Sequence, residues 1–375
     1  MVSEWFCAKN EGLLPPYRTA PNLTRLPDAS DASAMRALPS FHTHARLAVT
    51  AAIFSAACVL LRRASHYDRL RTTLAIGRLV GRLAHALVPF RRAVARENMQ
   101  RLAVTPSEQL DGISTERLDE LQRLAYVHLG RSLALSLIAG EWLQRHLHLP
   151  QELPSLVDDL QSGGALVCSA HLGVWELLPT ALAPHLPERA RRLGLVVYRP
   201  LHHRRLNHLV LRRRAASGIH LLPDRGAAPA MRAALRRGGL VGMLPDQRPS
   251  RSGVAATFLR QAVDFSPGLA TLHHATGAPV WFCVLLLDAD RQTDRQQPDQ
   301  HTTAERPSPT LRLHLLRLAE RRPPAAAAAD GAAPPPVDCA PLVQAYADAL
   351  SSAVEASPEQ YFWWHKRFSG RDTGK

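Results

Sequence analysis

His171 and Glu176 are the two residues whose types and spacing most suggest chemistry. They lie in the stretch ALVCSAHLGVWELLPTAL, residues 165–182, where an apolar run ending in small residues meets an imidazole and then a carboxylate. An imidazole takes a proton from a hydroxyl, and a neighbouring carboxylate fixes the tautomer of the ring and stabilises the imidazolium. The pair therefore suggests a general base with an orienting acid, and Gly173 allows the backbone between them to turn closely.

The sequence around this pair does not indicate a protein nucleophile. It lacks the G-x-S-x-G pattern of a nucleophilic serine, so we expect a substrate hydroxyl to attack an activated acyl group directly. Cys168 precedes His171 by three residues, but its apolar neighbours favour a buried structural thiol. Taken alone, an H-x4-E pair is more often two unrelated polar residues.

Short apolar runs rich in Val, Leu and Ile alternate with segments of helical composition in the second half of the chain. The runs are 163–170, 193–198, 218–222, 240–244 and 278–287. This alternation predicts an α/β fold in which a mostly parallel sheet is covered by helices. His171 would then follow the carboxyl end of a buried strand, at the rim where open α/β sheets hold ligands.

The charge balance points to an anionic partner. There are 46 Lys and Arg against 32 Asp and Glu, a net charge of +14, and nearly all of the excess is arginine. Arginine makes two-pronged contacts with phosphates and carboxylates, so nucleic acid, an acidic protein and an anionic lipid headgroup all fit. The five cysteines are scattered without a C-x-x-C pair, which favours a reducing compartment and gives no sign of a metal site.

The N-terminal part predicts a membrane attachment. Residues 1–44 have no helical or strand period and are expected to form a loose tail. A helix over 45–66 contains the uncharged run 47–61, which is short for a bilayer span, so it either crosses a thinned membrane or lies half-embedded as a monotopic anchor. A buried helix of a soluble domain is the alternative.

The remaining residues, 67–375, are expected to form one domain. At its start, 67–90 has an apolar stripe with arginines along its margins, which suits an anionic membrane surface or, equally, packing on the domain itself. The basic residues that follow the apolar run 47–61 favour a cytoplasmic location for the domain. The stretches 288–309 and 322–337 are polar or low in complexity and are expected to be flexible surface insertions.

Several motifs accompany the H-x4-E pair in a fixed order. They are ARENMQRLA (95–103), HLGRSL (128–133), SAHLGVWEL (169–177), VYRP (197–200), LRRGGLVGMLPDQRP (235–249) and SPEQYFWWHKRFSGR (357–371). With these motifs the sequence resembles the late acyltransferases of lipid A biosynthesis, the lauroyl and myristoyl transferase family within the lysophospholipid acyltransferase superfamily. The order and spacing make the match specific.

The resemblance implies an enzyme of lipopolysaccharide biosynthesis on the bacterial inner membrane, with its active site facing the cytoplasm and a fold like that of the glycerolipid acyltransferases. It would move a fatty acyl chain from acyl carrier protein, or from coenzyme A, to a hydroxyl of a lipid A precursor. His171 and Glu176 fall on the family's catalytic motif. Thioester chemistry of this kind requires neither a metal nor a nucleotide cofactor.

Other motif positions imply binding roles. Arg199, Arg214 and Asp246 align with functional residues of the family, and the two arginines suit a phosphate of the acceptor or the phosphopantetheine of the donor. Solvated surface arginines and a turn aspartate are the structural alternatives. Backbone amides after His171, or a nearby arginine, would stabilise the oxyanion. The aromatic C-terminal motif is expected to pack against the sheet, with Lys366 and Arg367 outside and His365 structural.

Three other functions remain open from the sequence. The same family chemistry fits another acceptor, such as a phosphatidylinositol mannoside or an ornithine lipid. A basic nucleic-acid-binding protein is disfavoured because aromatic residues make up only 6% of the chain and the basic residues cluster beside an apolar run. A catalytically inactive membrane adaptor is disfavoured by the intact His171 and Glu176.

Overall fold

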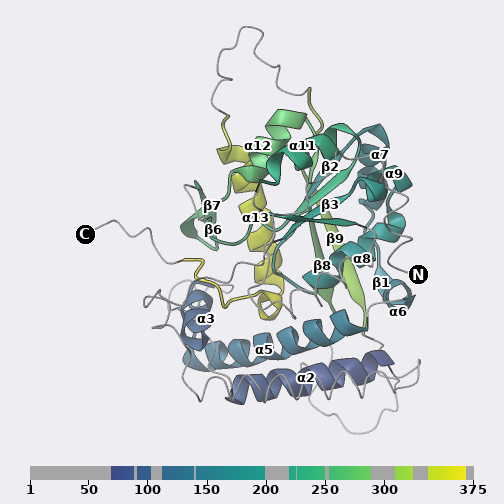
Figure 1. The fold of residues 1–375 in the computed structure, drawn as a ribbon. Coiled ribbons are helices and arrows are strands. Elements are labelled where there is room, and N and C mark those ends of the chain that lie inside the picture. Colours follow the sequence, from purple (N-terminus) through teal and green to yellow (C-terminus); the bar gives the residue numbers. More distant parts are fainter. Residues whose placement is uncertain are drawn as a thin grey trace, which may run out of the picture. The chain divides into compact units, whose positions relative to one another are not determined.

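A seven-stranded, mostly parallel sheet forms the centre of the structure, which is a computed structural model (Figure 1). The structure describes residues 69–87, 91–102, 112–138, 141–198, 219–224, 226–249, 253–288, 309–323 and 337–368. All of them belong to one compact unit, Val49–Lys375. The predicted tail (1–44) and anchor (45–66) lie outside the described residues. Among the helices that are described, none is both long enough and apolar enough to cross a membrane.

The strand order of the sheet is β1-β9-β8-β2-β5-β3-β4. The strands are β1 (Leu147–His148), β2 (Ala165–Cys168), β3 (Leu195–Tyr198), β4 (His220–Pro223), β5 (Leu240–Met243), β8 (Val280–Leu287) and β9 (Leu311–Ala319). The five predicted apolar runs are β2, β3, β4, β5 and β8, and the pairs β2–β5, β2–β8, β3–β4 and β3–β5 are all parallel. The predicted α/β fold with a mostly parallel sheet is confirmed.

The sheet places the ends of β2 and β5 side by side. Ala165 pairs with Leu240 and Cys168 with Met243, and the backbone N–H of Ser169 continues the pairing to the Met243 carbonyl at 2.8 Å. Both strands are buried because helices cover both faces of the sheet, as parallel sheets require. The segments that follow the two strands therefore meet at the carboxyl edge of the sheet.

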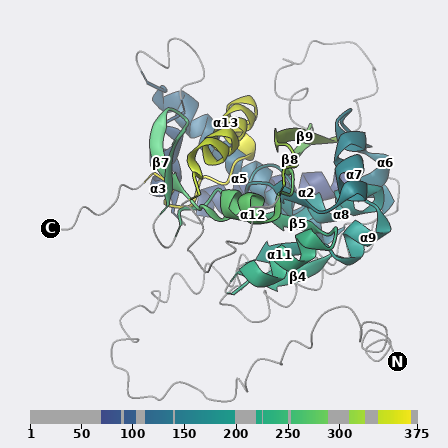
Figure 2. The same cartoon turned by 90° about the horizontal axis from the view of Figure 1, so that it is seen from above.

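The helices form two layers on the sheet. One face is covered by α11 (Ala228–Arg236), α12 (Gly268–Thr276) and α13 (Ala340–Ala356); the other by α7 (Leu153–Ser162), α8 (Leu178–Leu182) and α9 (Glu188–Arg192). Figure 2 shows α13 and α7 on opposite sides of β8. The short helix α6 (Glu141–Arg145) precedes β1, and α3 (Arg92–Met99) lies near the end of the longer α5 (Thr115–Leu137).

Helix α2 (Arg69–Leu87) lies along α5, and glycines make the close approach possible. A Cβ built on Gly130 of α5 would lie 2.2 Å from the Gly77 carbonyl oxygen and 2.7 Å from the Gly81 nitrogen. The amphipathic helix predicted at 67–90 is thus confirmed, and its glycine face packs on the domain. Its outer face is apolar in part, because Leu79 is 57% exposed and Leu87 is 52% exposed.

Two strand features were not predicted. β9 pairs antiparallel with β8, and β6 (Val254–Phe258) and β7 (Gln261–Phe265) form a separate antiparallel hairpin. The hairpin turns at Leu259 and Arg260, which both adopt positive φ although neither is glycine. The predicted insertion 288–309 follows β8 directly and is followed by β9, and most of it, like most of 322–337, lies outside the described residues.

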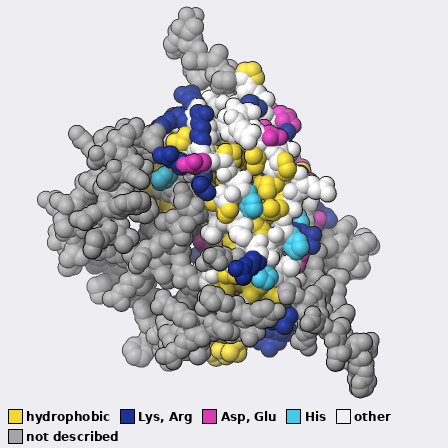
Figure 3. Space-filling model, turned by 90° about the vertical axis from the view of Figure 1, so that its right-hand side faces the viewer, with side chains coloured by type: hydrophobic (Ala, Val, Ile, Leu, Met, Phe, Trp, Pro, Cys, Tyr) yellow, Lys and Arg dark blue, Asp and Glu magenta, His cyan; other side chains and the backbone are white. Residues whose placement is uncertain are grey.

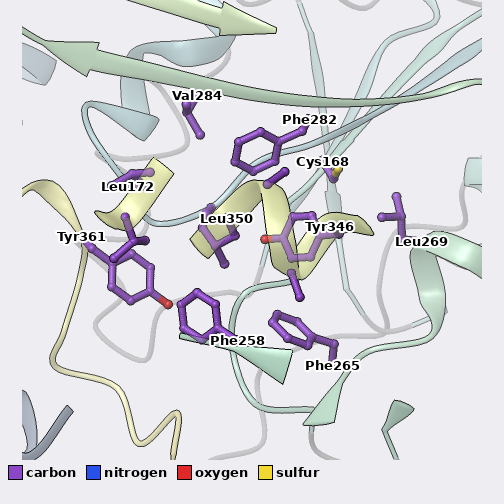
Figure 4. Close-up of a cluster of buried hydrophobic side chains, with 14 of the residues drawn as sticks. Cys168, Leu172, Phe258, Phe265, Leu269, Phe282, Val284, Tyr346, Leu350 and Tyr361 are labelled. Atoms are coloured by element: carbon purple, nitrogen blue, oxygen red, sulfur yellow. The ribbon is translucent and has the colours of Figure 1, made fainter. Parts of the chain in front are cut away.

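The core beneath the carboxyl edge of β2 is aromatic. Figure 4 shows Phe282, Tyr346, Phe265, Phe258 and Tyr361 gathered below the strand end, with their rings meeting largely edge to face. The hydroxyl of the buried Tyr346 donates to the Ser169 carbonyl at 2.8 Å. This bond satisfies a buried polar group and fixes the backbone two residues before His171.

Candidate active site

His171 and Asp246 form a two-point contact at the carboxyl edge of the sheet. The His171 ring nitrogen Nδ1 lies 2.9 Å from Asp246 Oδ1, and the His171 backbone N–H donates to Oδ2 at 3.0 Å. The contact follows from the sheet, because His171 follows β2 and Asp246 follows the adjacent β5. The His171 side chain is 23% exposed whereas that of Asp246 is fully buried, so the pair has one accessible end.

The charge state of Asp246 determines the tautomer of His171. Burial alone would raise the pKa of the Asp246 carboxyl, but the charge and hydrogen bonds of His171, together with His365, bring that pKa below its ordinary value. Asp246 is therefore ionised near neutral pH and only accepts hydrogen bonds. In the neutral ring of His171 the proton must then lie on Nδ1, which leaves the lone pair on Nε2.

The loop from His171 to Glu176 is held by backbone bonds to two distant segments. Gly173 N–H donates to the Gln360 carbonyl at 3.0 Å, and Val174 N–H donates to the Leu285 carbonyl at 2.8 Å. Gly173 has φ +66°, and a Cβ there would lie 2.0 Å from the Leu285 oxygen. Only glycine fits this turn, as the sequence led us to expect.

The C-terminal segment after η4 (Pro358–Gln360) completes the support of this loop. The Phe362 N–H donates to the His171 carbonyl at 2.9 Å, and the Phe362 ring centroid lies 6.1 Å from that of His171. Asn98 on α3 in turn donates to the carbonyls of Trp363 and His365 at 2.7 and 2.8 Å. The ARENMQRLA and PEQYFWWHKRF motifs therefore meet behind the His171 loop.

Glu176 lies in the short 3-10 turn η2 (Trp175–Leu177) rather than in a regular helix. Its Oε1 accepts from the indole N–H of Trp175 at 3.2 Å, and the Trp175 ring centroid is 5.6 Å from that of His171. The sequence led us to expect Glu176 beside the His171 ring. In the structure, the carboxylate at Nδ1 of His171 belongs to Asp246 instead. Glu176 lines the same cavity as His171.

A cavity of about 1020 Å³ opens beside these residues. Its polar lining residues include His171, Glu176 and Gln247, while much of the wall is apolar. Apolar lining residues include Val167, Leu178, Leu182, Val196, Met231, Leu240, Met243, Leu269, Leu272 and Phe362. The lining includes residues from Leu240 at the start of β5 to Gln247 beyond its end. A cavity with these walls suits an apolar group.

The other predicted site residues have different fates. Arg199 and Arg214 lie outside the described residues. Cys168 is fully buried, its thiol donates to the Trp281 carbonyl, and burial raises the pKa of that thiol, which agrees with a structural role.

The prediction that Arg367 lies outside is wrong. Arg367 is 2% exposed, donates to the Asp264 carbonyl and lies 3.8 Å from the Phe265 ring centroid, whereas Lys366 is exposed.

Three features of the site were not predicted from the sequence. Phe362 lines the cavity, His128 bonds to the Gly173 carbonyl, and Gln247 lies close to the His171 ring. The aromatic motif was expected only to pack, and Tyr361, Trp363 and Trp364 are indeed buried, but the strand-like backbone turns Phe362 toward the cavity. Gln247 follows Asp246 directly, so its position beyond β5 was a usable signal. Basic side chains on the face in Figure 3 lie in separate groups around a central apolar area.

The imidazole of His171 and the carboxylate of Asp246 thus meet at the carboxyl edge of a parallel sheet, beside a cavity with a largely apolar wall, and this is where enzymes of the open α/β class hold their ligands. A family model described as bacterial lipid A biosynthesis acyltransferase matches residues 39–369. The chain belongs to this family and is an enzyme that transfers acyl groups. A comparison with curated proteins gave no match.

Proposed function

We propose that the enzyme transfers a fatty acyl chain from acyl carrier protein, or from coenzyme A, to a hydroxyl of a lipid A precursor, with His171 as the general base. The observation that carries this proposal is the contact between His171 and the buried Asp246, because it leaves the lone pair on Nε2 beside the cavity. Family membership supports the lipid A precursor as acceptor. The apolar walls suit the acyl chain.

In the proposed reaction His171 moves one proton twice. Nε2 takes the proton of the acceptor hydroxyl while the hydroxyl oxygen bonds to the thioester carbonyl carbon. The carbonyl electron pair moves to its oxygen and then returns as the carbon–sulfur bond breaks. The departing thiolate receives the proton from Nε2, so the enzyme ends in its starting state.

Two carboxylates support His171 in this proposal. Asp246 holds Nδ1–H and stabilises the imidazolium through a charge-assisted hydrogen bond. Glu176, on the cavity wall and also bonded to Trp175, adds negative potential near the ring and helps to orient it. The division of work follows from burial, because Asp246 is enclosed and the partly exposed Glu176 is screened by water.

Binding of the polar parts of the substrates is assigned to arginines. Arg199 and Arg214 are proposed to hold a phosphate of the acceptor or the phosphopantetheine of the donor. Tyr198, which precedes Arg199, lines the cavity at the end of β3, so this part of the chain starts beside the site. We further propose that 47–61 attaches the enzyme to the inner membrane with the site facing the cytoplasm.

The test is acyl transfer by purified enzyme in detergent micelles, with labelled acyl carrier protein and a lipid A precursor. His171→Ala is expected to abolish transfer, whereas His148→Ala, which changes an exposed histidine on β1, should leave it unchanged. Parallel reactions with phosphatidylinositol mannoside and ornithine lipid compare acceptors. Full turnover by His171→Ala would refute the base assignment, and transfer only to another lipid would refute the acceptor.

A further inference from the structure

The oxyanion of an acyl transfer needs hydrogen-bond donors, and three backbone amides of the loop after His171 are already bonded within the protein. Gly173 N–H and Val174 N–H are both bonded to backbone carbonyls of other segments. Leu177 N–H is also taken, by the Val174 carbonyl at 2.9 Å. These three amides are therefore committed to holding the loop, which limits the part that backbone N–H groups can play in binding the oxyanion.

Gln247 brings a donor to the reacting nitrogen. Its side-chain nitrogen lies 3.4 Å from Nε2 of His171, and the residue is half-buried in the cavity wall. Because Asp246 keeps the ring proton on Nδ1, Nε2 presents a lone pair, and only the NH₂ end of the Gln247 amide can face it favourably. The orientation of the amide thus follows from the charge of Asp246.

We propose that the Gln247 side-chain amide is the oxyanion donor of the transfer reaction. The proposal rests on the proposed role of His171 as the base. When the acceptor hydroxyl binds, it takes the place of Gln247 at the single lone pair of Nε2, and after Nε2 has taken the hydroxyl proton the ring nitrogen is itself a donor. At that moment the carbonyl electron pair has moved to oxygen, next to the atom that has just lost its proton, and this oxyanion is the new acceptor for the amide.

The amide gains its strongest partner only after the carbon–oxygen bond has formed, which is what lowers a barrier rather than strengthening substrate binding. When the carbonyl forms again and the carbon–sulfur bond breaks, the thiolate takes the proton from Nε2. The lone pair of Nε2 is then restored, and Gln247 returns to it. A neutral amide does not repel the positively charged imidazolium, whereas the guanidinium of a nearby arginine would.

Two substitutions test the proposal. Gln247→Glu keeps the size and reach but replaces the donor with an anion, and Gln247→Ala removes the group. Both are expected to lower kcat by about 10²- to 10³-fold, the scale for loss of one oxyanion donor, with the KM of each substrate changed only a few-fold. Gln161→Glu on α7 makes the same exchange at an exposed position and should retain full kcat. Melting temperatures show whether each variant is folded.

Hydrolysis of an acyl-coenzyme A thioester by water forms the same oxyanion without a lipid acceptor, so it is measured beside transfer. Loss of both activities in the Gln247 variants supports the proposal. Full kcat in Gln247→Glu overturns the proposal, as does an effect limited to the KM of the acceptor. Arg248, an exposed arginine that also lines the cavity, is the rival donor, and a loss seen only in Arg248→Gln would likewise overturn the proposal. If wild type hydrolyses the thioester but acylates no lipid tested, the proposed acceptor fails while the Gln247 comparison still stands.

Discussion

His128 on α5 holds the carbonyl oxygen of Gly173 with its Nε2, 3.0 Å away and 45 positions along the chain. Burial, assisted by the nearby Arg131, lowers the pKa of His128 to about 4 against the opposing effect of the Gly173 bond, so the ring is neutral near pH 7. A carbonyl only accepts, and Nε2 must therefore carry the proton. The contact fixes the turn between His171 and Glu176 from behind.

His128→Leu is expected to lower the free energy of unfolding by about 1–3 kcal/mol, because it leaves the buried Gly173 carbonyl without its donor. It should also lower kcat, since the His171 loop loses a support. His128→Gln, which restores an N–H at similar reach, should recover much of both. Gln122→Leu is the control. Gln122 is also buried on α5, but it donates to the carbonyl of Arg92, which does not belong to the His171 loop. Denaturant unfolding and steady-state rates provide the measurements, and an unchanged kcat in His128→Leu would contradict the positioning role.

Stability should fall as the pH drops from 7 to 5. A histidine whose folded pKa is about 4 binds its proton in the unfolded chain near pH 6.5, so acid favours unfolding between these values. For His128 the loss from pH 7 to pH 5 is on the order of 2 kcal/mol. His365, whose pKa burial lowers to about 4, acts in the same direction. Denaturant unfolding at the two pH values should show a smaller loss in His128→Gln than in wild type, and equal losses would refute the assignment.

Asp246→Asn should reduce kcat far more than Glu176→Gln. The asparagine removes the charge that stabilises the imidazolium and no longer enforces the Nδ1–H tautomer, and in other His–Asp pairs this change costs about 10⁴-fold. Glu176→Gln removes a carboxylate that is partly exposed, so a smaller loss follows. Rates at saturating substrate distinguish the two. A larger loss in Glu176→Gln would assign the orienting role to Glu176 instead.

Gly130→Ala should destabilise the pair formed by α2 and α5. The added methyl group meets backbone atoms of Gly77 and Gly81, which cannot move as a side chain can, so a loss of about 1–3 kcal/mol is expected. Leu133→Ala, also on α5 but 39% exposed, should have little effect on thermal unfolding. If Gly130→Ala melts at the wild-type temperature, the close packing of α2 on α5 is refuted.

The sequence predicted the parts of the fold that depend on local pattern. The runs that became β2, β3, β4, β5 and β8 were recognisable because buried parallel strands read as short apolar segments. β9 carried a signal that was not used, since Leu311, Leu313 and Leu315 are buried and alternate with exposed residues. The turn at Leu259 and Arg260 gave no such signal, because positive φ normally indicates glycine or asparagine.

The position of the site in the fold was predictable from the sequence, but the contacts between its side chains were not. His171 was expected at the carboxyl edge of the sheet and Asp246 was assigned to substrate binding, whereas in the structure Asp246 is the partner of His171 Nδ1, a contact that depends on β5 lying next to β2. Chain order does not give that neighbour, because β3 and β4 intervene in the sequence. Arg367 was misplaced because a charged residue is normally expected at the surface, whereas its guanidinium here lies against the Phe265 ring.

The bonds from Gln360 and Phe362 to the His171 loop also have a consequence for biosynthesis. Ribosomes make proteins from the N-terminus, so His171 is synthesised almost two hundred residues before its last backbone partners. A nascent chain lacks those partners until residues 360–362 have left the exit tunnel. The loop that carries His171 therefore gains its full backbone support only once translation has passed that point.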